Sequence, residues 1–124
     1  MSPSEAIAAV RTALEAKPGA AGSPLPSAPG VTLYKVMGKM FAILEDRRIH
    51  NIILKCDPHL AEILREQYAG IGHRSHLDRR FWISIDFAAD VPVEEVERLA
   101  AHSYDLVRAG LTRKQKAELE TLQL

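Results

Sequence analysis

A chain of 124 residues with 47% apolar and 26% charged residues has the length and balance of one globular domain, which excludes a chain that is disordered throughout. Lys and Arg together number sixteen, as do Asp and Glu, and this zero net charge argues against a protein that coats nucleic acid through bulk charge. The lone cysteine, Cys56, excludes an internal disulfide framework and is typical of a reducing compartment.

The N-terminal region carries no export signal that we recognise. Met1-Ser2-Pro3-Ser4-Glu5 lacks the basic segment and apolar run of a signal peptide. The longest uncharged run, residues 18–34, is too rich in proline and glycine to cross a bilayer as a helix. We therefore expect a cytoplasmic protein without a membrane partner.

The charges are unevenly distributed along the chain. Counting Lys and Arg against Asp and Glu, residues 35–55 sum to +3 and residues 73–82 to +2. Residues 83–107 sum to −5, and residues 108–124 return to +2. This pattern predicts a basic centre beside an acidic helix.

Capping signals and apolar spacing predict four helices. The first follows the capping box Ser2-Pro3-Ser4-Glu5 and ends before a Pro/Gly-rich loop at residues 18–30. The second follows Asp57-Pro58, with a left-handed C-terminal cap expected at Gly70. The third runs from Pro92 to about Ala109, and the fourth is a tail helix within residues 112–124. Their inward-facing side chains are expected to be Ile7, Val10 and Leu14; Leu60, Ile63, Leu64 and Tyr68; Val96, Leu99, Ala100, Tyr104 and Val107; and, in the tail, Leu119 and Leu122.

Five strands are predicted between the helices. Residues 31–37, 40–44 and 49–55 form a meander whose turns lie at Gly38-Lys39 and at residues 45–48. Residues 81–87 alternate strictly between apolar and polar side chains, and a short strand at residues 75–77 is expected to pair with them. The resulting order, α-β-β-β-α-β-β-α plus the tail helix, predicts one α+β domain over residues 1–124, with helices packed on a mostly antiparallel five-stranded sheet.

Several short fragments, in their joint order and spacing, resemble the MmcQ/YjbR family of small bacterial proteins. They cover roughly residues 31–111, and they are Tyr34-Lys35-Val36, Gly38-Lys39-Met40-Phe41-Ala42, Leu54-Lys55-Cys56-Asp57-Pro58, Leu60 to Tyr68 with Gly70, His76-Leu77-Asp78-Arg79-Arg80 with Trp82-Ile83, and His102-Ser103-Tyr104-Asp105-Leu106-Val107. The resemblance implies a fold similar to bacterial secretion chaperones and frataxin-like proteins. It also implies DNA binding through a "double wing" motif, and it supplies no established catalytic residues. Residues 19–30 depart from the family by forming a longer link between first helix and sheet.

A cluster of basic and aromatic residues is the strongest candidate site. Guanidinium and imidazole groups contact phosphates, and a tryptophan stacks on a base. The alternative is an ordinary solvated loop in which Arg80 stacks on Trp82. Arg47 and Arg48, from the other hairpin, are additional candidates for a second basic wing. The predicted nucleic-acid-binding residues are Lys55, Arg74, His76, Arg79, Arg80 and Trp82.

Other chemistry finds little support in the residues. His73 and His76 lack further ligands at a familiar zinc spacing, so we expect no metal. Iron handling by the first helix would need a ridge of carboxylates, and that helix offers only Glu5 and Glu15. Cys56 precedes a helix but is expected to be a buried, inert thiol. No nucleophile with a base can be assembled, so we expect neither an enzyme nor a cofactor.

Two hypotheses therefore follow from the sequence. The first is a non-enzymatic protein that binds DNA, double-stranded in the double-wing interpretation, through its basic loop residues. The second is a protein-interaction module, chaperone-like or a homodimer, that presents its sheet face or its amphipathic tail to a polypeptide partner.

Overall fold

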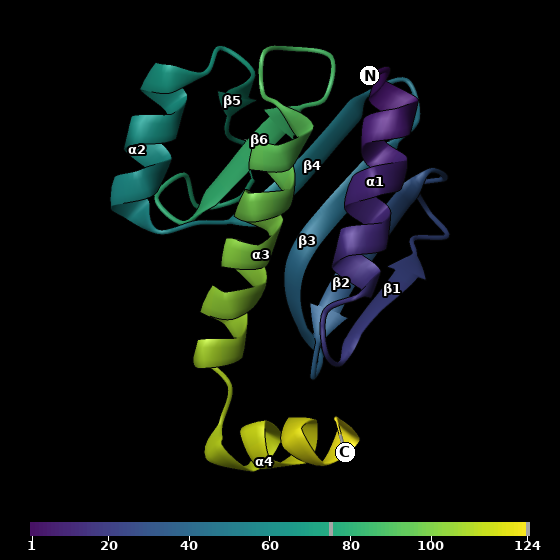
Figure 1. The fold of residues 1–124 in the computed structure, drawn as a ribbon, viewed down its shortest axis with the longest axis vertical. Helices are drawn as coiled ribbons and strands as arrows, with labels where there is room; N and C mark the ends of the chain where they lie inside the picture. Colours follow the sequence, from purple (N-terminus) through teal and green to yellow (C-terminus); the bar gives the residue numbers. More distant parts are fainter. Residues whose placement is uncertain (75, 124) are drawn as a thin grey trace.

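The computed structural model describes residues 1–74 and 76–123 and has two layers, an antiparallel sheet and the helices that cover one of its faces (Figure 1). The strand order is β1-β2-β3-β4-β6-β5, and every neighbouring pair is antiparallel. In chain order the elements are α1 (Pro3–Glu15), β1 (Ala20–Pro24), β2 (Val31–Val36), β3 (Lys39–Asp46), β4 (His50–Lys55), α2 (Pro58–Gln67), β5 (Ile71–Gly72), β6 (Trp82–Asp86), α3 (Val93–Ala109) and α4 (Arg113–Leu122). The α+β class and the helix-on-sheet arrangement predicted from the sequence are confirmed.

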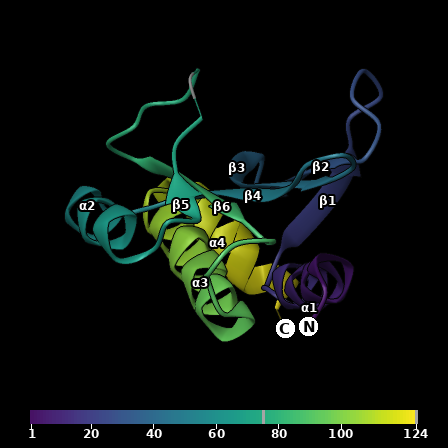
Figure 2. The same ribbon diagram turned by 90° about the horizontal axis from the view of Figure 1, so that it is seen from above.

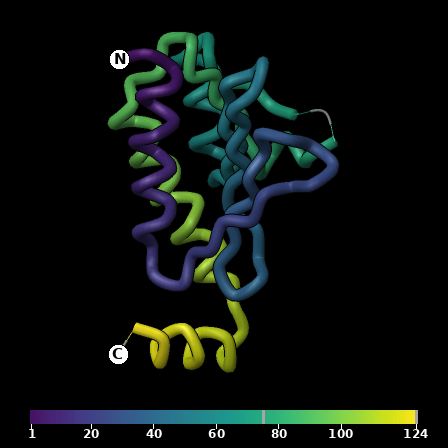
Figure 3. Tube along the Cα trace, turned by 90° about the vertical axis from the view of Figure 1, so that its right-hand side faces the viewer, coloured from purple at the N-terminus to yellow at the C-terminus, as the bar shows by residue number. Residues whose placement is uncertain are grey.

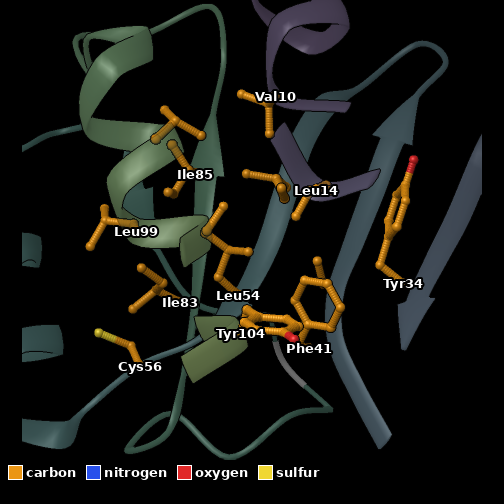
Figure 4. Close-up of a cluster of buried hydrophobic side chains, with 14 of the residues drawn as sticks. Val10, Leu14, Tyr34, Phe41, Leu54, Cys56, Ile83, Ile85, Leu99 and Tyr104 are labelled. Carbon is orange, nitrogen blue, oxygen red and sulfur yellow. The ribbon is translucent and has the colours of Figure 1, made fainter. Parts of the chain in front are cut away.

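The core lies between the sheet and the helices α1 and α3. Aliphatic side chains from alternate strand positions meet the apolar stripes of both helices, and Phe41 packs edge-on against Tyr104 with ring centroids 5.4 Å apart. Figure 4 shows ten labelled members of this cluster, from Val10 on α1 to Leu99 on α3. The inward-facing residues predicted for α1 and α3 are all buried.

The capping signals at three helix starts are confirmed. Capping boxes open α1 at Ser2 and α4 at Thr112, and the Asp57 side chain accepts hydrogen bonds from the first backbone amides of α2. At the other end of α2 the prediction of a left-handed Gly70 cap is wrong. The helix ends at Gln67 with Tyr68 extended, and the Asp90 carboxylate instead accepts hydrogen bonds from the amides of Ala69 and Gly70 at 2.9 and 2.8 Å.

The predicted loop at residues 18–30 contains a sixth strand, β1, at the edge of the sheet. Its residues are small, and Gly22 lies against the Tyr34 ring of β2, where an added Cβ would approach a ring carbon to 2.7 Å. Proline is tolerated on an edge strand because one side of such a strand needs no hydrogen-bond donors. The prediction failed here because β1 has no apolar alternation.

Three further boundaries differ from the predictions. The strand expected at residues 75–77 is not found: Ser75 lies outside the described residues, Leu77 lies in a turn, and β5 occupies this sheet position. The first hairpin reverses at Met37-Gly38, both with positive φ, which is one residue earlier than expected. β3 extends to Asp46, so Glu45 belongs to a strand.

Two predicted core residues are exposed. Ile63 on α2 is 57% exposed, and the helix instead buries Ala61 and Leu64. On α4, Leu122 is 69% exposed whereas Leu119 is fully buried. A single buried leucine is therefore the main anchor of the tail helix.

Candidate nucleic-acid interface

The sheet face opposite α1 and α3, called here the open face, carries the candidate site. Strand alternation points Ile52, Leu54, Ile83 and Ile85 toward the helices. The residues that alternate with them point to the open face. On β4 and β6, Lys55 lies opposite Trp82 and Ile53 opposite Ser84. On β2 and β3, Ile43 lies opposite Leu33 and Glu45 opposite Val31, and Ile43 also lies opposite Ile53 of β4.

Two loops rise from the open face, away from the helices (Figures 2 and 3). The first wing is the β1–β2 loop, residues 25–30, and the second wing is the described part of the β5–β6 loop, residues 73–74 and 76–81. The second wing contains the predicted basic cluster. The first wing has the sequence Leu-Pro-Ser-Ala-Pro-Gly and carries no charge. Arg47 and Arg48 lie in the turn between β3 and β4, as predicted, and therefore outside both of these loops. Their role as a second basic wing stays a prediction.

Arg74 anchors the second wing to the sheet. Its guanidinium forms an ion pair with Oε1 of Glu45, which is only 3% exposed. The other carboxylate oxygen of Glu45 accepts a hydrogen bond from Arg47 at 2.8 Å. A buried carboxylate requires such partners. Arg74 is therefore committed to holding its own loop, and we do not count it among the free phosphate contacts.

Arg80 is paired within the second wing. Its Nε and one terminal nitrogen donate to the two carboxylate oxygens of Asp78 at 3.1 and 2.8 Å. This hydrogen bonding lowers the pKa of Asp78 and raises that of Arg80. The guanidinium also lies 5.1 Å from the centroid of Phe81, so the predicted stacking partner, Trp82, is wrong. Because the pair is exposed, a competing anion can exchange with Asp78 at little cost.

The remaining predicted residues lie at the margin of the open face. Lys55 and Trp82 are directly opposite each other at neighbouring strand ends, and both are half-buried. Arg79 is exposed and borders a hollow of about 520 Å³ between α2 and the second wing. His76 is exposed at the rim of a groove between the two wings. Lys55 and Trp82 thus lie on the open face, His76 lies at the groove between the wings, Arg79 and Arg80 border the hollow beside α2, and Arg74 is the anchor.

Sequence reasoning missed Arg65, which supports the second wing from α2. Its guanidinium donates to the carbonyl oxygens of Arg79 at 2.7 Å, Trp82 at 2.9 Å and Gly72 at 3.3 Å. Burial, and secondarily the charge of Arg79, lowers the pKa of Arg65. Nothing local in the sequence signals this role, because all three acceptors are backbone carbonyls beyond the helix. Glu45 was missed as well, because the run of charged residues at 45–48 predicted a turn, whereas β3 extends to Asp46.

The charges are segregated between the open face and the rest of the molecule. The open face, its wings and the adjoining β3–β4 turn carry seven basic side chains, Lys35, Arg47, Arg48, Lys55, Arg74, Arg79 and Arg80, against four acidic ones, Glu45, Asp46, Asp78 and Asp86. The remainder of the chain has nine basic against twelve acidic residues. Counted over these elements, a neutral protein therefore has an excess of three positive charges, and Glu62 and Glu66 of α2 line the hollow beside Arg79 and Arg80.

The thiol, the candidate metal ligands and the helices were also considered as functional features in the sequence. Cys56 is buried as predicted, and burial, with the nearby Asp57 carboxylate, raises the pKa of its thiol to about 11. Within residues 1–74 and 76–123, no three His, Cys, Asp or Glu side chains gather as a metal site. In that same part of the chain, no helix is long and apolar enough to span a membrane.

Comparison with known proteins fixes the family. The YjbR family model matches residues 15–106, about three quarters of the chain. The chain belongs to the YjbR family. It is 30% identical over 92 residues to the uncharacterized protein YjbR of Escherichia coli K12, covering 72% of this chain and 75% of that one. It is 27% identical over 90 residues to the uncharacterized protein YbdF of Escherichia coli O157:H7, covering 72% and 74%.

Solved structures share the fold. The crystal structure of the Deinococcus radiodurans protein DR2400, a DUF419 domain, superposes with a TM-score of 0.82 at 25% identity, covering 96% of this chain and 91% of that one. A Pseudomonas syringae protein superposes with a TM-score of 0.67 at 21% identity, covering 86% and 98%. The predicted resemblance to the MmcQ/YjbR family is confirmed.

Proposed function

We propose that this YjbR-family protein binds DNA through the open face of its sheet, as a binding protein and not as a catalyst. The observation that carries the proposal is the excess of three positive charges on the open face and its wings in a chain of zero net charge. Phosphate contact depends on such local excess, since neutralising phosphates releases condensed counterions. A basic face on a neutral protein supports binding at that face only, without general coating of nucleic acid.

The structure narrows the residues expected to contact phosphates. Lys55 and Arg79 from the predicted set are joined by Arg48, which is exposed in the β3–β4 turn. Arg80 contributes by exchanging its exposed partner Asp78 for a phosphate. His76 lies between these groups at the groove rim. Arg74 contributes indirectly by fixing the second wing on Glu45.

The hypothesis of a protein-interaction module loses one of its motivating observations. Leu119 of the tail helix is buried inside its own chain, beside Gly19. The β1 edge also offers little for pairing with a second copy. The amide of Ala20 already donates to the carbonyl of Lys17 at 3.0 Å, and Pro24 has no amide hydrogen. These features favour the sheet face over the tail or this edge as the interaction surface.

The test is fluorescence anisotropy with a labelled DNA duplex, with salt raised from about 50 to 200 mM. A triple variant, Arg48→Glu, Lys55→Glu and Arg79→Glu, reverses charge on the open face. A matched triple variant, Arg113→Glu, Lys114→Glu and Lys116→Glu, makes the same charge change on α4. We expect the first variant to lose roughly 100-fold or more in affinity at low salt and the second to stay within about threefold. Equal loss in both would show that only overall charge matters, and no loss in either would refute the assigned residues.

A further inference from the structure

The groove between the two wings has an aliphatic floor, which phosphate contact does not use. Leu33 and Ile43 are half-buried on the open face, and Val31 and Ile53 beside them are 6% and 3% exposed. Leu25 and Leu77 contribute the walls from the first and second wing, and the space between them is about 270 Å³. Interfaces with the backbone of a duplex are polar and strongly basic. A recessed aliphatic floor at the centre of a basic face therefore calls for a ligand with apolar surfaces as well as negative charge.

We propose that the open face binds unpaired DNA, with bases seated in the groove and phosphates held by the basic side chains at its margin. This inference rests on the DNA binding proposed above and names the form of the DNA. A duplex keeps the faces of its bases stacked inside and presents phosphates and base edges to a protein. An unpaired strand exposes the base faces, which are the part of a nucleic acid that desolvated apolar side chains can contact.

The arrangement along β4 and β6 supports a path for such a strand. Trp82 lies on the open face directly opposite Lys55. Ile53, two residues before Lys55 on the same strand, points to the same side and begins the aliphatic floor. An aromatic ring, a cation and an apolar groove thus follow one another across adjacent strands. Sheets bind unpaired bases through this combination, in which rings stack on bases and cations follow the backbone.

Charge complementarity distinguishes this occupant from a neutral peptide. The groove is bordered by Arg47 and Arg74, which share the single carboxylate of Glu45, and by His76. This rim therefore has an excess of one guanidinium charge close to the apolar floor. The groove and its rim together fit a ligand that has apolar faces and a negative charge close to each of them. A single-stranded oligonucleotide has this chemistry, because every nucleotide carries one base and one phosphate.

The experiment compares three ligands of matched phosphate count on the full chain at about 100 mM salt. They are an oligothymidylate, the same strand with abasic sites, and a duplex with the same number of phosphates per protein site. A poly-glutamate peptide of equal charge is a fourth ligand. Trp82 is the single tryptophan of the chain, so its fluorescence reports on base stacking without a label.

We expect the oligothymidylate to bind roughly tenfold or more tightly than the abasic strand and the duplex, and to quench Trp82 where the abasic strand does not. Equal binding of thymidylate and abasic strands would overturn the inference while leaving the proposed function intact, as would preference for the duplex. Equal binding of the peptide would overturn it by showing that charge alone is recognised. Failure of every nucleic acid to bind at low salt would instead refute the proposed function.

Variants locate the contact. Leu33→Gln and Ile43→Gln each place a polar group on the groove floor, and Ile63→Gln makes the matched change on the exposed side of α2. We expect the groove variants to lose the thymidylate advantage over the abasic strand while the Ile63 variant retains it. Thermal unfolding followed by circular dichroism checks that each variant is folded. Retained preference in folded groove variants would place the bases elsewhere and overturn the inference.

Discussion

Glu45 and Arg74 form an ion pair across 29 residues of chain, and this pair fixes the second wing to the open face of the sheet. Glu45 is 3% exposed at its site in β3, so its charge is stabilised by Arg74 on one oxygen and by Arg47 on the other. The second wing carries Arg79 and Arg80 and leads into Trp82. Its position therefore depends on a carboxylate in a strand that is distant in the sequence. Removing that anchor and removing a phosphate contact should have different consequences.

Arg74→Ala is expected to lower the free energy of unfolding by about 1–3 kcal/mol, because one oxygen of a buried carboxylate loses its partner. Arg79→Ala should change it by less than about 0.5 kcal/mol, because the Arg79 side chain is exposed. Urea denaturation followed by circular dichroism measures both. Adding Glu45→Gln to Arg74→Ala should recover part of the loss, since the neutral amide is less costly to leave unpaired. Equal stability of the two single variants would contradict the anchoring role of Arg74.

The salt dependence of DNA binding should fall with each lost phosphate contact. We expect Lys55→Gln and Arg79→Gln each to reduce the slope of log affinity against log salt by about 0.7–0.9, as one fewer counterion is released. Lys114→Gln on α4 provides the control with an unchanged slope. Anisotropy titrations at four or more salt concentrations give the slopes. A slope that is unchanged in Lys55→Gln and Arg79→Gln would remove these two residues from the interface.

Ser103 joins α3 to two strands of the sheet. Its hydroxyl donates to the carbonyl of Phe41 at 2.5 Å and accepts from the amide of Lys55 at 2.9 Å, and the residue is fully buried. Ser103→Ala leaves both backbone groups without this partner, so we expect a loss of about 1–3 kcal/mol in the free energy of unfolding. Ser23→Ala on the exposed edge strand is the control, expected within about 0.5 kcal/mol of the parent. Urea midpoints that coincide for the two variants would show that the Ser103 bridge is dispensable.

The sequence predicted those elements whose signals are local. The periodicity of α1 and α3, their caps, and the alternation around Ile83 and Ile85 are each complete within a short stretch. β1 was missed because it is defined by the strand beside it: Gly22 is small where the Tyr34 ring needs space. No periodicity within Ala20–Pro24 expresses that relationship.

The candidate site divides in the same way. Residue type and clustering predicted that Lys55 and Trp82 would lie together, and the register of β4 and β6 places them opposite each other. The partners of the arginines could not be predicted, because they come from other elements. Arg74 meets a carboxylate 29 residues away, and Arg65 reaches the carbonyl of Trp82 from 17 residues away. The distinction between an anchoring arginine and an available one is a property of the tertiary structure.

Cys56 should resist alkylation in the folded protein. Burial, followed by the Asp57 charge, raises the pKa of its thiol from 9.0 to about 11, so the reactive thiolate is scarce at about pH 8. Iodoacetamide labelling followed by mass spectrometry should be slow in the native state and rapid in urea.

Between pH 9 and 11 the unfolded chain releases the proton of the Cys56 thiol while the folded chain keeps it. The thiol therefore contributes stability below pH 9 that is lost as the pH rises through this window. Cys56→Ser should abolish that part of the pH dependence, and rapid native labelling would contradict the burial.

Leu119 and Leu122 provide a matched test of how α4 is held. Leu119 is fully buried, and its side chain occupies the space in which a Cβ at Gly19 would lie, whereas Leu122 on the same helix is 69% exposed. Leu119→Ala should cost about 2–5 kcal/mol of unfolding free energy through the lost contacts and the cavity left behind. Leu122→Ala should remain within about 0.5 kcal/mol of the parent. Urea denaturation separates the two, and light scattering on both variants asks whether Leu122 contributes to association. A Leu119 variant as stable as the parent would mean that α4 is detached in solution, and its apolar stripe would again be available to a protein partner.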